Sequence, residues 1–210
     1  MKRMFLLAVL AVLAITGCQQ SKPVKTIENL KAGIVGETTA SAKYAAFAVR
    51  AQEDGNEAVA KLFLAASKAE DIHAANHRKV LEGLGEKMDE FVPSFDVKTT
   101  MENLQDAFEG ETYEVDTMYP QFLLDAATEK VEKATKSFTW ASDTEKIHLD
   151  FYKNAVASIV VSASEKTAPS AIILPAGYAV CPICGNTYDS AAMDDKCAFC
   201  QTEKEKYIMI

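Results

Sequence analysis

The chain has 210 residues, with 30 acidic side chains against 22 basic ones and a formal net charge of −8. Hydrophobic residues make up 49% of the sequence and charged residues 25%, which excludes a wholly disordered chain, a collagen-like chain and a polytopic membrane protein. The acidic excess argues against a nucleic-acid-binding protein, because binding to phosphates requires a clustered excess of Lys and Arg.

Residues 1–17 have the pattern of a signal peptide. Lys2 and Arg3 precede an apolar run of 12 residues, 4–15, which is too short to span a ~30 Å hydrocarbon core at ~1.5 Å per residue. Gly17 and Cys18 then form a junction that resembles a bacterial lipobox. This junction predicts that Cys18 is lipidated and becomes the new N-terminus. A plain secretory signal with an incidental cysteine is the alternative.

A lipidated Cys18 places the mature protein outside the cytoplasm, on the periplasmic or cell-surface side of a bacterial membrane. The lipid anchor is then its predicted attachment to the membrane, and residues 18–25 are a short tether. Removal of Lys2 and Arg3 with the signal peptide leaves 30 acidic against 20 basic residues, so the mature chain is more acidic still.

The middle of the chain contains two copies of one unit. Segment 26–38 recurs as 100–112, an offset of 74 residues, and segment 57–73 recurs as 132–148, an offset of 75. In the second pair the identical residues are Glu57 and Glu132, Lys61 and Lys136, Phe63 and Phe138, Ala66 and Ala141, Ser67 and Ser142, Glu70 and Glu145, Ile72 and Ile147, and His73 and His148.

Each copy predicts two helices, because apolar residues recur at three- and four-residue spacing. Thr26 and Thr100 are the predicted N-caps of the first helix in each copy. Turns are expected at 53–56 and 128–130, and a crossover of about a dozen residues that includes Pro93 separates the copies. We therefore expect a four-helix bundle over 26–161, with helices near 26–54, 57–84, 100–127 and 131–161.

Two Glu-x-x-His motifs stand at matching positions of the repeat. Residues three apart share a helix face, so each motif aims a carboxylate and an imidazole at one point. A single motif is typical of a solvated surface pair, but here each copy adds a matching glutamate on its first helix. Such a set is the arrangement of a di-iron or di-manganese carboxylate centre. The predicted ligands are Glu37, Glu70, His73, Glu111, Glu145 and His148.

Glu114 lies three residues after Glu111 and has Ala40 at the equivalent position of the first copy. With this extra glutamate, the chain resembles a rubrerythrin over about residues 26–207. The resemblance implies a mainly α fold, a ferritin-like four-helix bundle followed by a small rubredoxin-like four-cysteine metal domain. It also implies that two Fe ions occupy the bundle and that Glu114 and His73 exchange as ligands of one of them with redox state. The residues expected to bridge the irons are Glu70 and Glu145.

Tyr44 and Tyr119 match tyrosines beside the family's site, which adds them to Glu114 and His73 as predicted catalytic residues. Core packing with a hydrogen-bonded hydroxyl is compatible with the same positions. His77 has Tyr152 as its counterpart in the second copy, and it is predicted to lie at the surface or just behind the ligands. Trp140 is predicted to be a packing residue.

The C-terminal part carries two Cys-x-x-Cys pairs separated by 12 residues: Cys181 with Cys184, and Cys197 with Cys200. Paired motifs of this kind predict a tetrahedral thiolate cage, and the spacing alone does not separate zinc from iron. The resemblance implies one Fe ion that relays electrons. Gln201 is a departure from the family pattern, in which Gly often follows the second pair. The linker is predicted at 162–177 and the four-cysteine domain at 178–210.

The resemblance implies a peroxidase that reduces hydrogen peroxide to water in oxidative-stress defence. It also implies a homodimer in which the rubredoxin-like domain of one subunit lies near the di-iron site of another. An exported protein needs an extracytoplasmic electron donor. Two alternatives stay open: a ferroxidase or iron-sequestering protein, and a non-enzymatic redox sensor with zinc in the four-cysteine site.

Overall fold

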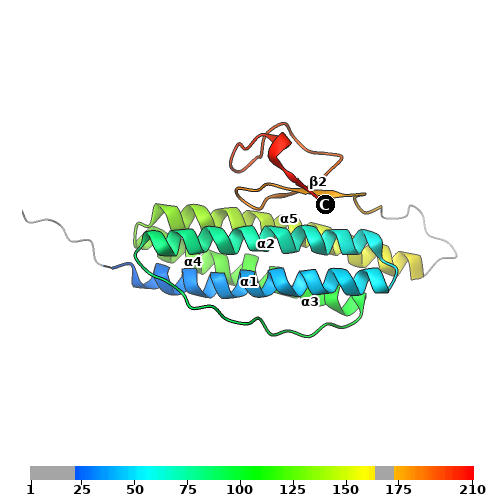
Figure 1. Cartoon of the computed structure of the whole chain (residues 1–210), viewed down its shortest axis with the longest axis horizontal. Coiled ribbons are helices and arrows are strands. Elements are labelled where there is room, and N and C mark those ends of the chain that lie inside the picture. The colour runs from blue at the N-terminus through cyan, green and yellow to red at the C-terminus, as the bar shows by residue number, and fades with distance from the viewer. Residues whose placement is uncertain (1–21, 164–172) are drawn as a thin grey trace, which may run out of the picture.

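A computed structural model describes residues 22–163 and 173–210, and it shows a long four-helix bundle with a small β domain on one side (Figure 1). The described chain confirms the predicted mainly helical bundle. None of the described helices is long and apolar enough to cross a membrane. The helical elements are α1 (Val24–Glu53), α2 (Glu57–Gly83), α3 (Thr100–Tyr113), a π-helical turn η1 (Glu114–Met118), α4 (Tyr119–Thr128) and α5 (Glu132–Ala163).

The two copies are joined by a crossover at residues 84–99. It runs along the outside of the bundle and connects the end of α2 to the start of α3 at the opposite end (Figure 1). The turn after α1 contains Gly55 and the turn after α2 contains Gly85, both with positive φ, a conformation that glycine adopts without steric cost. The expected crossover and the turn near 128–130 are both present.

Both predicted N-caps were wrong. The first helix begins at Val24, so Thr26 lies inside its first turn. At the other repeat the cap is Thr99, whose hydroxyl accepts from the Glu102 backbone N–H while the Glu102 carboxylate accepts from the Thr99 N–H. This reciprocal capping box satisfies two backbone donors at once, which explains why the helix begins one residue after Thr99.

The turn of each copy caps the first helix of the other copy. Asp54 accepts from the backbone N–H and the hydroxyl of Thr100, at 3.1 and 2.7 Å. Glu129 accepts from the backbone N–H groups of Lys25 and Thr26, at 3.0 and 2.7 Å. Carboxylates at helix N-termini stabilise unpaired N–H groups and the helix dipole. The repeat is thus closed by two equivalent electrostatic contacts.

The third helix differs from the expected continuous segment 100–127. A π-helical turn at Glu114–Met118 divides it into α3 and α4. A π turn adds one residue to a helix without ending it, and such turns concentrate at functional sites. The result is a change in the direction of the side chains that follow Glu111.

Two equivalent aromatic clusters fill the bundle on either side of its middle. The Tyr44 cluster has ring-centroid separations of 5.4–6.2 Å, and the Tyr119 cluster has separations of 5.0–6.1 Å. Burial of each phenylalanine contributes about 1.5–3 kcal/mol. The Tyr44 cluster comprises Tyr44, Phe47, Phe63 and Tyr152, and the Tyr119 cluster comprises Tyr119, Phe122, Phe138 and His77.

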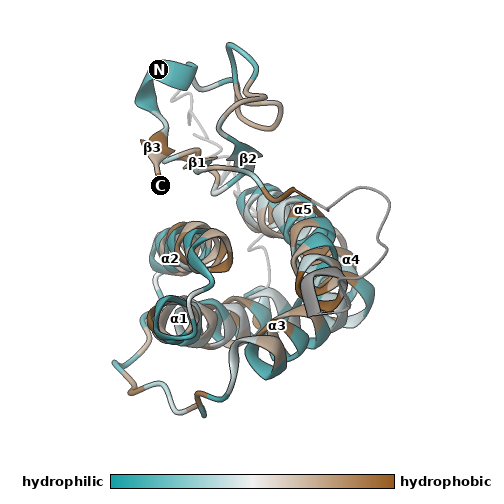
Figure 2. Ribbon diagram, turned by 90° about the vertical axis from the view of Figure 1, so that its right-hand side faces the viewer, coloured by the Kyte–Doolittle hydropathy of each residue, from teal (hydrophilic) through white to brown (hydrophobic). Residues whose placement is uncertain are grey.

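The C-terminal domain is a three-stranded antiparallel sheet in the order β2-β1-β3. Seen along the bundle, it lies over α2 and α5 (Figure 2). Tyr178 packs edge-on against Phe151 of α5, with ring centroids 5.2 Å apart. The strands are β1 (Tyr178–Val180), β2 (Thr187–Asp189) and β3 (Ile208–Met209), and a 3₁₀ turn η2 (Lys204–Lys206) precedes the last strand.

We expect Glu129→Gln to lower the melting temperature by about 2–4 °C at neutral pH, because loss of a charged cap costs about 1 kcal/mol. Partial burial raises the pKa of Glu129, but the donors Thr26 and Lys25 outweigh it and hold the pKa below its ordinary value. The stabilisation is therefore present above the ordinary glutamate pKa and is lost as pH falls through the lower folded-state value. Thermal melts across this range measure the effect.

The matched control is Glu90→Gln, which removes the same charge from an exposed crossover position. An equal loss of melting temperature in both variants would contradict the capping role of Glu129.

Candidate metal centres

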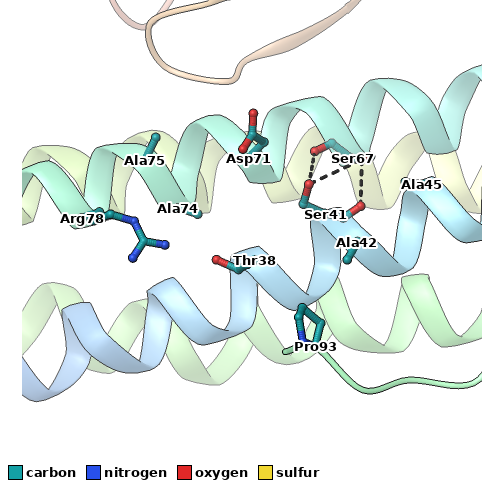
Figure 3. Close-up of a pocket in the computed structure, with 10 residues that line it drawn as sticks. All are labelled: Thr38, Ser41, Ala42, Ala45, Ser67, Asp71, Ala74, Ala75, Arg78 and Pro93. Atoms are coloured by element: carbon teal, nitrogen blue, oxygen red, sulfur yellow. Dashed lines mark hydrogen bonds between the residues drawn. The ribbon is translucent and has the colours of Figure 1, made fainter. Parts of the chain in front are cut away.

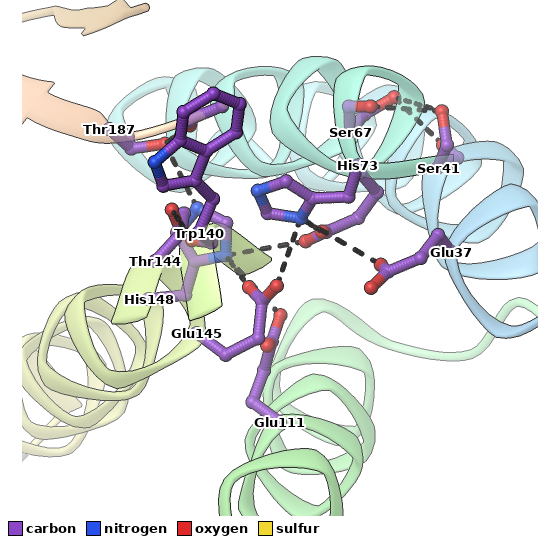
Figure 4. Close-up of polar contacts among 12 residues, drawn as sticks. Glu37, Ser41, Ser67, His73, Glu111, Trp140, Thr144, Glu145, His148 and Thr187 are labelled. Carbon is purple, nitrogen blue, oxygen red and sulfur yellow. Dashed lines mark hydrogen bonds and ion pairs between the residues drawn. The ribbon is translucent and has the colours of Figure 1, made fainter. Parts of the chain in front are cut away.

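Six of the seven predicted bundle ligands converge at one level between the two aromatic clusters (Figure 4). They come from four helices: α1 and α3 each supply one glutamate, and α2 and α5 each supply one Glu-x-x-His motif. All six side chains are at most 1% exposed. The six are Glu37, Glu70, His73, Glu111, Glu145 and His148.

The six ligands form two overlapping groups, and in each group the ligand atoms lie within 4.8 Å of one another. Glu70 and Glu145 belong to both groups. Glu145 Oε1 lies 3.0 Å from His73 Nδ1, and Glu145 Oε2 lies 2.9 Å from His148 Nδ1. Each of the two shared carboxylates therefore has one oxygen directed at each group, which is the geometry of a ligand that bridges two metal ions.

Burial makes the carboxyl cluster unfavourable without cations. Burial, reinforced by the charges of Glu70 and Glu145, raises the pKa of both Glu37 and Glu111 well above the ordinary value. Burial also opposes ionisation of Glu70, but hydrogen bonds from His148 and His73 hold its pKa at about 2. Several buried carboxylates therefore repel one another whenever they are ionised together. Divalent cations between them would relieve this repulsion.

The donor atoms fit two such ions. Among the described residues, Glu37 Oε2 and Glu111 Oε2 are buried without a hydrogen-bond partner. Unpartnered buried oxygens are costly unless a cation coordinates them. Carboxylate and imidazole donors in this number suit iron or manganese. Both histidines present Nδ1 to the cluster.

Glu114 is the predicted ligand that lies apart. It is the first residue of the π turn, it is half-buried, and it belongs to neither group of ligand atoms. Its carboxylate faces Gly36, where a Cβ would lie 3.9 Å from Glu114 Oε1. Burial and the neighbouring Glu37 and Glu111 raise its pKa well above the ordinary value. In this structure His73 is among the ligands and Glu114 stands beside them.

Two tyrosines hold carboxylates across the repeat. Tyr44 donates to Glu111 Oε1 at 3.0 Å, and Tyr119 donates to Glu37 Oε1. Burial raises the pKa of both phenols well above the ordinary value, so both keep their protons and act as donors. Each pair links a residue of one copy to a ligand of the other.

His77 is fully buried, which excludes the surface position and confirms the alternative that it lies just behind the ligands. Its Nε2 lies 3.1 Å from the Tyr119 hydroxyl, immediately behind the ligand Glu37. Trp140 is partly buried against the four-cysteine domain, and Lys136 lies over its ring at 4.6 Å from the centroid.

The four cysteines of the C-terminal domain form the second centre. All four Sγ atoms lie within 4.8 Å of one another, and Cys181–Cys200 and Cys184–Cys197 are each separated by 3.4 Å, with no disulfide. A tetrahedral metal–thiolate site with bonds of ~2.3 Å has sulfur–sulfur edges of roughly 3.8 Å, close to these values. The neighbouring sulfurs of Cys181 and Cys197, with burial, raise the pKa of Cys184. Four thiolates at this spacing require a cation.

The second cysteine loop adopts the same backbone shape as the first. Gly185 N–H donates to Cys181 O at 3.0 Å, and Gln201 N–H donates to Cys197 O at 2.9 Å. Both residues have positive φ, 84° for Gly185 and 62° for Gln201. Gln201 therefore replaces the usual glycine without removing the loop, and its side chain donates to Cys197 O at 3.1 Å.

The four-cysteine domain touches the bundle at both histidines. Thr187 Oγ1 lies 3.0 Å from His148 Nε2 (Figure 4). Gly185 packs so closely that a Cβ would lie 2.7 Å from His73 Cδ2. In this structure the contact is made within one chain, whereas the resemblance placed it between two subunits. The predicted homodimer stays a prediction.

A hollow of about 340 Å³ lies between α1 and α2, on the face that the crossover covers at Pro93 (Figure 3). Its floor holds Ser41 and Ser67, each of which donates to the other's backbone carbonyl, at 2.9 and 2.8 Å. Thr38 and Ala74, the neighbours of Glu37 and His73, line it, but no metal ligand does. This hollow is therefore separate from the donor atoms.

The predicted lipidation site and the start of the tether fall outside the described residues. Cys18 and the signal peptide 1–17 belong to residues 1–21, and most of the linker falls in 164–172. The π turn and the contact of Gly185 with His73 are the functional features that sequence reasoning missed.

Comparisons with known proteins agree with this geometry. A family model described as rubrerythrin matches residues 28–156. Nigerythrin of Nitratidesulfovibrio vulgaris is 34% identical over 190 residues, which cover 87% of this chain and 85% of the relative. Rubrerythrin-2 of Clostridium acetobutylicum is 29% identical over 187 residues, covering 89% and 97%.

Solved structures of similar proteins have the same architecture. Nigerythrin in its fully reduced, all-ferrous state matches with a TM-score of 0.75 at 34% identity, covering 88% of this chain and 86% of that one. Reduced symerythrin from Cyanophora paradoxa matches with a TM-score of 0.52 at 18% identity, which bears on the fold alone. These matches confirm the ferritin-like bundle followed by a four-cysteine domain.

We expect Glu70→Ala to lose metal from both positions of the bundle site, because its carboxylate belongs to both groups of ligand atoms. Glu114→Ala should keep most of its metal, because Glu114 belongs to neither. Metal content per chain, measured by elemental analysis, distinguishes the two variants. Glu109→Ala, an exposed acid on α3, is the control. Equal metal loss in Glu70→Ala and Glu114→Ala would contradict these positions.

We expect Gly185→Ala to separate the four-cysteine domain from the bundle, because the new methyl group overlaps the His73 ring. Gly85→Ala is the control, since Gly85 has the same left-handed backbone but open space around it. Small-angle scattering should show a larger radius of gyration for Gly185→Ala alone, while the thiolate absorption shows that the cage still forms. A Gly185→Ala variant as compact as Gly85→Ala would refute the close contact.

Proposed function

The chain belongs to the rubrerythrin family, whose members are oxidoreductases with di-iron functions in oxidative stress, and we propose that it is a non-haem di-iron peroxidase. In this proposal it reduces hydrogen peroxide to water with two Fe ions in the bundle site. A third Fe ion in the four-cysteine site passes electrons inward. The solved nigerythrin structures support iron, because they are described as fully reduced, mixed-valent and partially reduced states.

The observation that carries the proposal is the contact between the two centres. Gly185, which directly follows Cys184, packs on His73, and Thr187 lies within hydrogen-bond distance of His148. A closed thiolate cage has no position for substrate, so with iron in it the chemistry that it can supply is electron transfer. Only Gly185 separates the cage cysteine Cys184 from the bundle ligand His73, and such a short separation suits electron transfer between the two centres.

The reaction consumes one peroxide, two electrons and two protons and forms two waters. When bound, two irons would supply the two electrons that cleave the O–O bond. Glu70 and Glu145 would contribute ligand atoms to both ions, and Tyr119 and Tyr44 hold Glu37 and Glu111 by hydrogen bonds. Because both phenols stay protonated, each remains a hydrogen-bond donor beside the site.

The asymmetry of the ligands supports a redox-linked exchange. His73 is held between Glu70 and Glu145, while Glu114 stands next to Gly36 outside the ligand groups. We assign the exchange of one ion's ligand to these two residues. The π turn is the element that presents Glu114 to the site, because it redirects the helix after Glu111.

The proposed location is extracytoplasmic, with Cys18 lipidated and the protein attached to a bacterial membrane through that lipid alone. The proposed electron donor is then an extracytoplasmic or membrane-bound carrier, and the proposed assembly is a homodimer. Metabolic labelling with a fatty acid tests the anchor, since Cys18→Ser should lose the label and enter the soluble fraction.

We expect chemically reduced protein to be reoxidised at least tenfold faster by anaerobic peroxide than by air-saturated buffer. Stopped-flow absorption measures the reoxidation of both metal centres. Bleached thiolate absorption should return together with the bundle site. Cys197→Ser is the control: it should slow electron supply to the bundle site and leave the peroxide reaction of the pre-reduced bundle site unchanged.

The competing functions predict other results. Faster reoxidation by air with continued uptake of added Fe(II) would favour a ferroxidase. A colourless protein with zinc at the cysteines would remove the electron relay and favour a redox sensor.

A further inference from the structure

A row of hydrogen-bonded polar side chains extends outward from the metal site, beginning at Tyr119. The Tyr119 hydroxyl donates to Glu37 and lies 3.1 Å from His77 Nε2. On the other side of the ring, His77 Nδ1 lies 2.7 Å from Ser137 Oγ. Tyr119 and His77 are completely buried, and Ser137 is 5% exposed. Two side chains, His77 and Tyr119, therefore connect Ser137 to the predicted ligand Glu37.

The outer end of this row reaches a surface hollow. Ser137 lines a hollow of about 400 Å³ between α2 and α5, next to Trp140. Lys79, Lys133 and Lys136 also line it. A hollow bordered by three lysines is hydrated, so Ser137 stands between solvent and a buried histidine.

The internal repeat allows these hydrogen-bonded side chains to be compared with their counterparts on the other side of the metal site. The equivalent of Tyr119 is Tyr44, which donates to Glu111 in the same way. Behind Tyr44, however, the counterpart of His77 is Tyr152 and the counterpart of Ser137 is Leu62, which is fully buried. Leu62 thus interrupts the polar route behind Tyr44, while the route behind Tyr119 continues through His77 to Ser137.

Space for the histidine is provided by Gly33. A Cβ at Gly33 would lie 3.0 Å from His77 Cδ2, and the counterpart in the other copy is Ala107. The bundle therefore accommodates the His77 ring because α1 has glycine at position 33, where the other copy has alanine.

The hydrogen bonds define one direction. Tyr119 donates to Glu37, so its oxygen accepts from His77 Nε2–H, and His77 Nδ1 must accept from the Ser137 hydroxyl. Each ring nitrogen of the fully buried His77 has a hydroxyl within hydrogen-bond distance and no carboxylate, so the ring is neutral and carries one donor and one acceptor. The Nε2–H tautomer is assigned from these partners. Ser137 Oγ can still accept one hydrogen bond, and the residue lines the hollow.

We infer that Ser137, His77 and Tyr119 form a proton-entry route from the lysine-lined hollow to Glu37. A proton that reaches Ser137 releases the Ser137 proton to His77 Nδ1, His77 Nε2 releases one to Tyr119, and Tyr119 releases one to Glu37. Each O–H or N–H bond that breaks is matched by one that forms, so no group keeps a net charge. Glu37 passes its proton on to the peroxide oxygen, and the His77 ring and the two hydroxyls turn back to their starting arrangement before the next proton enters. Two such cycles supply the two protons that one peroxide consumes. The direction of flow rests on the proposed function, but the route itself does not.

The first test uses nuclear magnetic resonance on the full chain loaded with diamagnetic zinc. The chain has three histidines, so their ring ¹⁵N signals can be assigned. We expect His77 to be protonated at Nε2, and Ser137→Ala to slow exchange of that proton with solvent by about tenfold. Tyr152→Phe, at the mirror position of His77, should leave the exchange rate unchanged.

The second test is reoxidation of the reduced iron protein by peroxide. Ser137→Ala and His77→Phe should lower the rate about tenfold with metal content unchanged, and the solvent deuterium isotope effect should rise. Gly33→Ala should give a smaller loss, because the His77 ring must shift.

The two tests separate the route from the proposed function. If wild-type protein is not reoxidised by peroxide but Ser137→Ala still slows the His77 exchange, the peroxidase proposal fails and the route stands. An Nδ1–H tautomer, unchanged exchange in Ser137→Ala, or an equal change in Tyr152→Phe would overturn the route.

Discussion

The constraint on which the rest of the structure depends is the burial of four glutamates at one level of the bundle. An isolated ionised carboxylate away from water costs many kcal/mol, and side chains of Glu37, Glu70, Glu111 and Glu145 are at most 1% exposed. Two imidazoles offset only part of this cost. Divalent cations complete the charge balance, so metal binding and folding are coupled in this chain.

That constraint explains why neither copy of the repeat is complete alone. Each group of ligand atoms takes carboxylates from both copies, and each tyrosine of one copy holds a glutamate of the other. At the bundle ends, Asp54 and Glu129 repeat the exchange by capping each other's helices. The two copies are therefore joined at the ends as well as in the middle, which resists the splaying that repulsion among carboxylates would cause.

Periodicity and motif spacing predicted the four helices, the crossover and the residues that meet at the metal sites, because these follow from helix faces and from repetition. The π turn was not predicted, although the offset between the two copies of the repeat indicates it. The offset between copies is 74 residues before Glu114 and 75 after Thr128, so the second copy has gained one residue. A helix absorbs one extra residue as a π turn, whereas a loop would have ended it. The sequence left open whether His77 lies at the surface or behind the ligands, because its partners Ser137 and Tyr119 are distant in sequence and only packing brings them together. The choice of Thr99 over Thr100 as a cap depended on Asp54, which is equally remote.

The four-cysteine domain shows how position protects chemistry. Its sulfurs form two close pairs at 3.4 Å, a short movement away from the ~2.05 Å of a disulfide. In the extracytoplasmic location proposed for this chain, an empty cage would be exposed to oxidation. A bound metal ion fixes all four thiolates in tetrahedral directions and removes the free thiol that disulfide exchange requires. Docking adds a second protection, because the Cys184 loop faces the bundle at His73 and Cys184 itself has no exposed surface. The contact that we propose for electron transfer therefore also shields the four-cysteine centre, and loss of docking would expose the Cys184 loop to oxidants.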